Sequence, residues 1–312
     1  MEIFGLIEKN RKNLKASSIN NYIRNIRILN NNQTINNLDF LLDKKQILDK
    51  IKDKKPTSQR NVLTSVVVVL QSTEDKKFDK VIEQYKENLK ELSSKIENNY
   101  KKNQLSDKES NNWLSFDELK KIQKNLEKKV NELNLSKKDK INPKDNKLLL
   151  HYLIASLYTL HPPLRLDWAN MHYTKNKEDI KDDTKNWIYD KGTFSKIVYL
   201  NDFKNVKKHG KQEFKINKEL VRIINLYRKF NQGKKLLLNS RGATLTQNTL
   251  SKMIPVIFKK GNKRINLNMI RKSKVTSIVK PEQVKKEEEL AEDMLHTSKV
   301  QKMIYSKSEN KE

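Results

Sequence analysis

The sequence predicts a mainly α-helical protein with one small antiparallel β-sheet, an α+β fold in two domains. Three observations support this class. Apolar residues recur every three or four positions along much of the chain, as on one face of a helix. Short apolar runs of strand length gather between residues 187 and 216. Between Glu97 and Asn112 hydrophobicity collapses to Asn, Lys, Ser and Asp, which indicates an exposed linker.

The first hundred residues are predicted to form helices. Ser17 or Ser18 can cap a helix with one apolar face, formed by Ile19, Tyr22, Ile23 and Ile26. A second helix is predicted to start near Thr57-Ser58, after Pro56, and to run to Leu70. Its valine block at 66–69 has strand propensity, but the neighbouring segments are helical and no alternating hairpin partner lies nearby. A third helix is predicted over Phe78 to about Ile96, with Val81, Ile82, Tyr85 and Leu89 along one stripe.

The second half opens with a helix signal. Ser115 and Glu118 form an S-x-x-E capping box before a helix that carries Leu119, Ile122 and Leu126. Residues 148–160 are apolar on nearly every side, which predicts a central core helix that Pro162 and Pro163 terminate. Strands are expected around residues 187–189, 197–200 and 213–216, followed by a helix with Leu220, Ile223, Ile224 and Tyr227 at helical spacing. We therefore predict a helical N-terminal domain over 1–100, a linker over 101–112 and a second domain over 113–312.

The charge indicates a polyanionic partner. The chain carries 66 Lys and Arg against 38 Asp and Glu, a formal net charge of +28, and binding to phosphate backbones explains such a surplus. No apolar run approaches the length of a membrane span, and the charged segment Met1 to Lys15 does not resemble a signal peptide, so we expect a soluble intracellular protein without a membrane partner. The glycines form no phosphate-binding loop, and neither the dispersed histidines nor the absent cysteines supply a zinc motif.

Cleavage of a phosphodiester without metal or nucleotide requires a nucleophile, cations around the non-bridging oxygens and an acid for the leaving oxygen. Arg165 follows the core helix, where a rigid element can hold its planar guanidinium against two phosphate oxygens. The alternative for this residue is a surface arginine that pairs with Asp167. Arg271 comes three residues after Asn268, so on a helix both side chains project from one face.

Near the C-terminus, His296 precedes Tyr305 by nine positions. At about 100° per residue this spacing would place them on opposite faces of an unbroken helix. A shared site therefore requires a break, which Thr297-Ser298 can provide by capping a following helix that presents the tyrosine. The alternative is a tyrosine on an amphipathic terminal helix and a histidine satisfied at a helix end.

Taken in order, the segment LHPPLRLDWANMHY at 160–173, Asn268-Met269-Ile270-Arg271, Met294-Leu295-His296-Thr297-Ser298 and Tyr305 resemble the tyrosine recombinase and integrase family, whose catalytic order is Arg, Lys, His-x-x-Arg, His, Tyr. The resemblance implies a core-binding domain that clamps DNA, followed by a catalytic domain from Trp113 onward. It implies that Tyr305 attacks the scissile phosphate to give a 3′-phosphotyrosine, that Arg165 and Arg271 stabilise the transition state, and that His296 hydrogen-bonds the phosphate.

In that family a lysine in a β-hairpin turn is the general acid. The resemblance assigns it to Lys204 in the run Tyr199-Leu200-Asn201-Asp202-Phe203-Lys204, with Lys207 and Lys208 as alternatives. Asn268 stands where the family has histidine, and it can donate a hydrogen bond but not act as acid or base near neutral pH. Few residues follow Tyr305, so a C-terminal segment that docks on a neighbouring subunit would be very short.

The function predicted from this resemblance is site-specific DNA recombination, integrating or excising a viral or mobile element. It needs neither metal nor ATP nor another cofactor. The expected partners are double-stranded DNA and copies of the same chain, as a tetramer on paired DNA sites, wherever the DNA lies: a host nucleus, a virus factory or the cytoplasm. The alternatives are a type IB topoisomerase, which relaxes one duplex as a monomer and usually has lysine at the Asn268 position, and a non-catalytic DNA-binding relic of the family.

Overall fold

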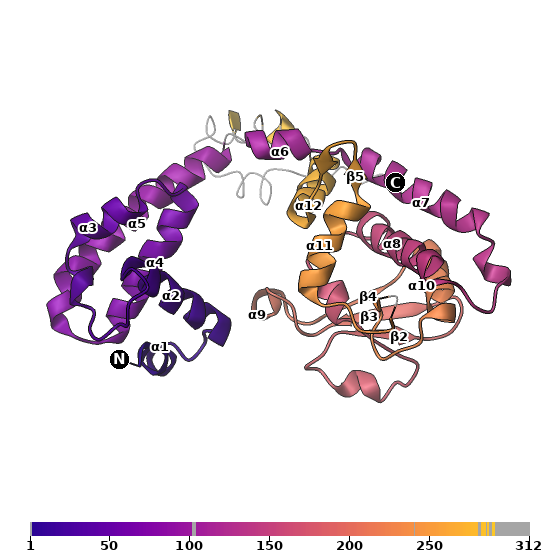
Figure 1. Ribbon diagram of the computed structural model, residues 1–312, viewed down its shortest axis with the longest axis horizontal. Helices are drawn as coiled ribbons and strands as arrows, with labels where there is room; N and C mark the ends of the chain where they lie inside the picture. Colours follow the sequence, from indigo (N-terminus) through magenta and orange to yellow (C-terminus); the bar gives the residue numbers. More distant parts are fainter. Residues whose placement is uncertain are drawn as a thin grey trace. The chain divides into compact units, whose positions relative to one another are not determined.

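The computed structural model describes residues 2–101, 104–239, 241–279, 282–284, 286 and 289–290. The chain divides into two compact units, Met1–Gln104 and Leu105–Glu312 (Figure 1). Each unit has its own cluster of buried apolar side chains. Within the described part of the chain, no helix combines the length and the apolar content that crossing a membrane requires.

The described residues of the N-terminal unit form helices joined by loops, with no strand among them. Its helices are α1 (Ile3–Asn10), α2 (Ala16–Leu29), α3 (Lys44–Ile51), α4 (Pro56–Ser72) and α5 (Asp79–Lys101), with 3-10 turns at Asp39–Leu41 and Lys76–Phe78. Helix α4 packs against α1, α2 and α5. The valine block at 66–69 is buried within it. The prediction of a helix here is confirmed, and burial on several sides explains why its valines show no helical stripe.

Two predicted details of this unit are wrong. The carbonyl of Lys15 already accepts the N–H of Ile19, so α2 begins before Ser17 and Ser18, and neither serine caps it. Helix α5 continues past Ile96 to Lys101, into the segment whose composition indicated a linker. The polar residues there form the exposed continuation of an amphipathic helix, which composition alone does not distinguish from a loop.

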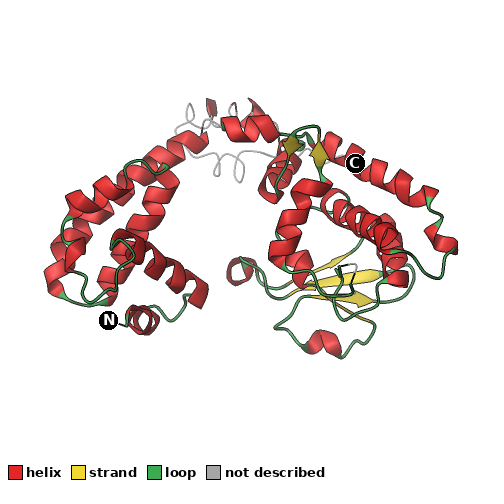
Figure 2. Ribbon diagram, in the orientation of Figure 1, coloured by secondary structure: helices red, strands yellow, loops and turns green. Residues whose placement is uncertain are grey.

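The second unit combines helices with a small sheet (Figure 2). Its helices are α6 (Asp107–Asn112), α7 (Phe116–Glu132), α8 (Pro143–Thr159), α9 (Val206–His209), α10 (Lys218–Phe230), α11 (Gln247–Ile257) and α12 (Leu267–Thr276), with 3-10 turns at Leu135–Lys137, Asp167–Asn170 and Asp179–Lys181. The strands are β1 (His172–Thr174), β2 (Trp187–Asp190), β3 (Lys196–Leu200), β4 (Gln212–Lys215), β5 (Lys259–Lys260) and β6 (Lys263–Arg264). Helix α8 is the core helix predicted, and it packs against α7, α10 and α11.

The four-stranded sheet is mixed, so the prediction of a purely antiparallel sheet is wrong. Its order is β1-β2-β3-β4, with β1 parallel to β2 and the other pairs antiparallel. Strands β2, β3 and β4 match the three predicted segments. Strand β1 was not predicted because three residues are too few to show alternation, and residues 175–186 give the crossover that a parallel pair needs.

Part of the predicted linker is helical and belongs to the second unit. Glu109 accepts the backbone N–H of Ser106 at 3.2 Å, which caps the start of α6. Glu109 also pairs with Lys272 on α12, and the side chain of Asn112 accepts the N–H of Arg264 at 3.0 Å. The 101–112 linker prediction is therefore wrong for α6, because capping and ion pairs can order a segment that lacks apolar residues.

The sheet end near the β2–β3 turn contains a buried ion pair. Lys196 is fully buried, and its Nζ lies 2.6 Å from Oδ1 of Asp190. Tyr173 donates its hydroxyl to the other oxygen of Asp190 at 2.6 Å. Burial opposes ionisation of Asp190, but the hydrogen bonds from Lys196 and Tyr173 outweigh it and leave its pKa below the ordinary value. The pair fixes this end of β2 and β3 together.

The predicted capping box of α7 is present, and its glutamate also forms an ion pair. Glu118 accepts the N–H of Ser115 at 2.8 Å, and its other oxygen lies 2.6 Å from Nζ of Lys260 in the β5–β6 hairpin. The bond from Lys260, together with the cap, lowers the pKa of Glu118 to about 2. The carboxylate therefore links the start of α7 to a hairpin far away in the sequence.

We expect Glu118→Gln to lower the free energy of unfolding at pH 7 by less than about 1 kcal/mol, since Gln keeps the cap but loses an exposed ion pair. Because the pKa of Glu118 is lower in the folded than in the unfolded protein, its carboxylate stabilises the fold at pH values above the unfolded-state pKa of about 4.5. This contribution is lost as the pH falls toward the folded-state pKa of about 2. The difference between wild type and variant should therefore shrink over that interval. Urea unfolding at a series of pH values measures it, with Glu132→Gln at the other end of α7 as the control. A difference that grows on acidification would contradict the assignment.

Candidate functional site

Arg165 lies in a turn that buried residues hold in place. Helix α8 ends at Thr159, and the hydroxyl of Tyr158, itself fully buried, donates to the carbonyl of Arg165 at 2.8 Å. Three residues later, Trp168 is fully buried in the 3-10 turn Asp167–Asn170. The ring of His161 stacks on Phe214 of β4 with centroids 4.5 Å apart. The backbone of Arg165 is thus fixed on both sides, while its side chain remains half-buried.

Arg271 lies on α12, whose start is also well defined. The side chain of Asn266 caps the helix by accepting the N–H of Met269 at 3.0 Å. Ile270 and Ser273 are buried on either side of Arg271, and Ser273 donates to the carbonyl of Leu114 at 2.9 Å. The arginine itself is half-buried. Packing of its neighbours therefore sets the direction from which its guanidinium leaves the helix.

Arg165 and Arg271 lie close enough in the structure for their charges to interact. Burial lowers the pKa of Arg271, the positive charge of Arg165 lowers it further, and Asp167 acts in the opposite direction. Burial likewise raises the pKa of Asp167, and the charge of Arg165 partly offsets this. Arg165 therefore interacts electrostatically with Asp167 and with the second arginine. Two half-buried cations that repel each other favour binding of an anion between them.

The connection between β3 and β4, residues 201–211, starts beside this site. The charge of Asp202 raises the pKa of Asp167, and Lys204 follows two residues later with an exposed side chain. Lys207 and Lys208 are exposed on the short helix α9 in the same connection. Sequence patterns gave no signal for Asp202, because only the return of the chain along β3 places it near Asp167.

A second lysine occupies a hairpin turn, but at the other end of the sheet. Lys191 lies in the turn between β2 and β3, next to the buried pair of Asp190 and Lys196. Since β3 runs from Lys196 to Leu200, the β2–β3 turn and the β3–β4 connection leave it at opposite ends. The connection that carries Lys204, rather than Lys191, is therefore the one that begins near Arg165.

Of the remaining predicted site residues, the structure describes Asn268. Asn268 is exposed on α12 one turn before Arg271, so the expected common helix is present. His296 and Tyr305 lie outside the described residues, and the break expected between them lies there too. The structure thus places the predicted cations, and the histidine and the tyrosine stay predictions.

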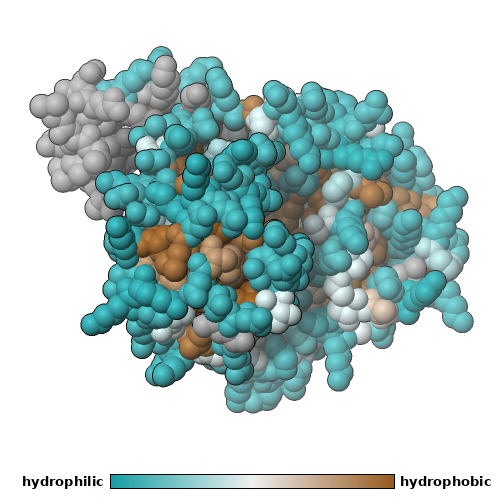
Figure 3. Space-filling model, turned by 60° about the vertical axis from the view of Figure 1, so that its left-hand side comes forward, coloured by the Kyte–Doolittle hydropathy of each residue, from teal (hydrophilic) through white to brown (hydrophobic). Residues whose placement is uncertain are grey.

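The N-terminal unit contains a polar groove of about 800 Å³ between α2, α3 and α4. Three of its lining residues are cations, Arg24, Lys50 and Lys54, and none is acidic. Amides and hydroxyls make up much of the rest: Asn21, Asn25, Asn31, Asn61, Ser18, Ser58, Thr64 and Ser65. Hydrophilic residues also dominate the face of the molecule drawn in Figure 3. Such a lining suits an anionic polymer that also offers hydrogen-bonding edges.

The arrangement in the second unit can bind and polarise a phosphodiester. Two guanidiniums can bind non-bridging oxygens, and the neighbouring connection carries the exposed lysines Lys204, Lys207 and Lys208. No protein-family model matches this chain, and no match was found among curated proteins or solved structures.

Proposed function

We propose that the chain is a DNA strand transferase of the tyrosine recombinase type. The observation that carries the proposal is the interaction of two half-buried arginines that lie far apart in the sequence, in which the charge of Arg165 lowers the pKa of Arg271. Half-buried and fixed by their neighbours, these arginines are organised before substrate binds. Preorganised cations of this kind stabilise the charge that develops on a phosphate during displacement.

In the proposed reaction the phenolic oxygen of Tyr305 attacks the scissile phosphorus. The hydroxyl proton of Tyr305 passes to solvent as a bond forms between that oxygen and phosphorus, the bond from phosphorus to the 5′ oxygen breaks, and Lys204 gives a proton to the leaving oxygen. Arg165 and Arg271 bind the non-bridging oxygens, while His296 and Asn268 donate hydrogen bonds to the phosphate. Attack by the 5′ hydroxyl of a second strand reverses these steps and rejoins the DNA, so bond energy is conserved.

Double-stranded DNA is the proposed partner, and the net charge of +28 supports this. We assign the groove of the N-terminal unit to the DNA surface, because its cations suit phosphates and its asparagines suit adenine edges. Recombination joins two duplexes, so we propose a homotetramer on paired sites, acting on a viral or mobile element.

The groove assignment makes a salt-dependence prediction. We expect Arg24→Ala and Lys54→Ala each to weaken DNA binding and to reduce the slope of log affinity against log salt by about 1, the effect of losing one phosphate contact. Fluorescence anisotropy with a labelled duplex at several salt concentrations measures the slope. Lys90→Ala, which removes an exposed cation on α5 outside the groove, is the control. Equal slopes for all these proteins would contradict the assignment.

The function itself is tested by incubating the full chain with supercoiled plasmid and with duplexes from candidate element ends, without added metal. After denaturation, protein attached covalently to DNA 3′ ends is the expected product. Strand exchange between two duplexes would support a recombinase. Plasmid relaxation without exchange would indicate a topoisomerase, and intact DNA binding without any adduct would indicate the non-catalytic relic.

A further inference from the structure

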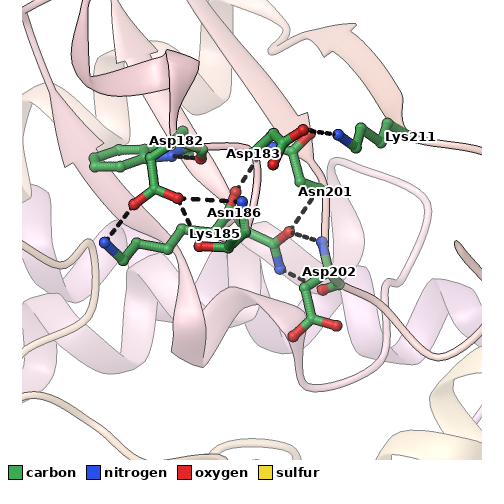
Figure 4. A network of polar contacts seen from close by, with 9 residues as sticks. Asp182, Asp183, Lys185, Asn186, Asn201, Asp202 and Lys211 are labelled. Carbon is green, nitrogen blue, oxygen red and sulfur yellow. Dashed lines mark hydrogen bonds and ion pairs between the residues drawn. The ribbon is translucent and has the colours of Figure 1, made fainter.

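A segment before β2 is hydrogen-bonded to the connection that carries Lys204. Residues 182–186 lie against the start and the end of residues 201–211, as the polar network in Figure 4 shows. This segment ends the crossover between β1 and β2, and the antiparallel pairing of β2 with β3 brings it next to the connection. Its contacts are hydrogen bonds and one ion pair rather than apolar packing.

Asn186 is the centre of this network. Only 3% of the residue is exposed. Its side-chain oxygen accepts the backbone N–H groups of Asn201 and Asp202, both at 2.8 Å, and its side-chain nitrogen donates to the carbonyl of Asp202 at 2.7 Å. A backbone N–H can only donate and a carbonyl can only accept, so these partners fix the orientation of the amide.

Residues next to Asn186 make further contacts with both ends of the connection. The side chain of Asn201 donates to the carbonyl of Lys185 at 2.8 Å. At the far end, Lys211 pairs with Asp183. Lys204 lies between these anchors, two residues beyond the Asp202 backbone that Asn186 holds. The anchors therefore set the path on which the lysine leaves the sheet.

We propose that Asn186 is a positioning residue for the general acid of the strand-transfer reaction, holding the connection so that Lys204 reaches the leaving 5′ oxygen. The inference rests on the proposed function. Asn186 itself touches no reacting group, and it acts through the backbone of Asn201 and Asp202. A buried amide with three hydrogen bonds to backbone is suited to this, because each lost bond leaves an unpaired buried group and shifts the chain it held.

Sulfur substitution separates this role from a merely structural one. In a duplex with sulfur at the 5′ bridging position, the departing thiolate needs no proton, because a thiol ionises near pH 8.5, far more readily than an alcohol. Loss of a correctly placed general acid should therefore slow cleavage of the oxygen substrate and leave cleavage of the sulfur substrate nearly unchanged. A general disturbance of the fold should slow both.

The experiment compares single-turnover cleavage of the two substrates, built on a site that the wild type cleaves in plasmid. We expect Lys204→Ala to slow the oxygen substrate by about 10²- to 10⁴-fold and Asn186→Ala by about 10- to 100-fold, each with near wild-type rates on sulfur. Asn186→Asp keeps the acceptor for two N–H groups but not the donor, so its loss should be smaller and equally selective. This variant also serves if Asn186→Ala does not fold.

Asn231→Ala is the matched control. Asn231 is 5% exposed, and its side chain also makes three hydrogen bonds, to the side chain of Asn146 and the carbonyl of Tyr227. It lies near the start of α8, at the opposite end of that helix from Arg165. We expect no selective loss on the oxygen substrate from this variant.

The outcomes distinguish the two proposals. A wild type that cleaves neither substrate overturns the proposed function. If the wild type cleaves both and Lys204→Ala, Lys207→Ala or Lys208→Ala is selective for oxygen, the function stands. A loss on both substrates for the Asn186 variants, or no loss on either, then overturns the positioning role alone.

Discussion

Replacing Tyr305 with phenylalanine is expected to abolish the covalent protein–DNA adduct and to leave DNA binding unchanged. The substitution removes one oxygen atom, the proposed nucleophile, and keeps the aromatic ring. Loss of a nucleophile lowers cleavage by about 10⁴-fold or more in enzymes that form covalent intermediates. Denaturing gels of radiolabelled duplex measure the adduct, and anisotropy with the same duplex measures binding.

Tyr100→Phe is the control for this change. Tyr100 is 68% exposed on α5 in the N-terminal unit, and we expect its variant to form adduct at the wild-type rate. An adduct that persists in Tyr305→Phe would show that another residue attacks the phosphate. Parallel loss of binding and adduct would instead indicate that the C-terminal segment contributes to DNA contact.

Removal of either arginine of the candidate site should lower cleavage by about 10²- to 10³-fold, the usual effect of losing one preorganised donor to a developing oxyanion. Arg165→Lys and Arg271→Lys should recover little of this, because an ammonium cannot bind two phosphate oxygens with a planar fork. Because both side chains are proposed to bind one phosphate, the double variant should lose less than the product of the single losses.

Stability gives an independent measurement for Arg271. Burial and the charge of Arg165 both disfavour its ionised form, so Arg271→Met, which keeps much of the length of the side chain, should unfold at a temperature equal to or above that of the wild type. Cleavage and stability then change in opposite directions. Arg222→Met, an exposed change on α10, is the control for both measurements. Wild-type cleavage by Arg271→Met would remove it from the site.

The helices were the part of the fold most accessible from sequence. The cap at Ser115 and Glu118 and the apolar segment now seen as α8 carry local signals that tertiary structure did not override. Strand β1 carries none, since its three residues gain their pairing from β2 and from the segment around Lys235. Parallel pairing depends on the path of the crossover segment between the two strands, and the local sequence does not determine that path.

The sequence alone indicates candidate site residues by type and order but gives no distances between them. Arg165 and Arg271 could be named from their motifs, whereas their mutual repulsion and the proximity of Asp202 to Asp167 depend on how α8, α12 and β3 meet. The burial of Lys196 had no signal, because one lysine is indistinguishable among 66 Lys and Arg. The same holds for Asn186 in a chain rich in asparagine.

The separate cores of the two units have a consequence for synthesis. The buried apolar side chains of the first unit all precede residue 97, and those of the second begin at Leu114. All residues of the first core are therefore synthesised while the second unit is still being translated. Domains generally fold as units during translation, the N-terminal one first. We expect the valine-rich helix α4 of the nascent chain to become buried early. Early burial shortens the time in which its aggregation-prone apolar surface is exposed to other chains.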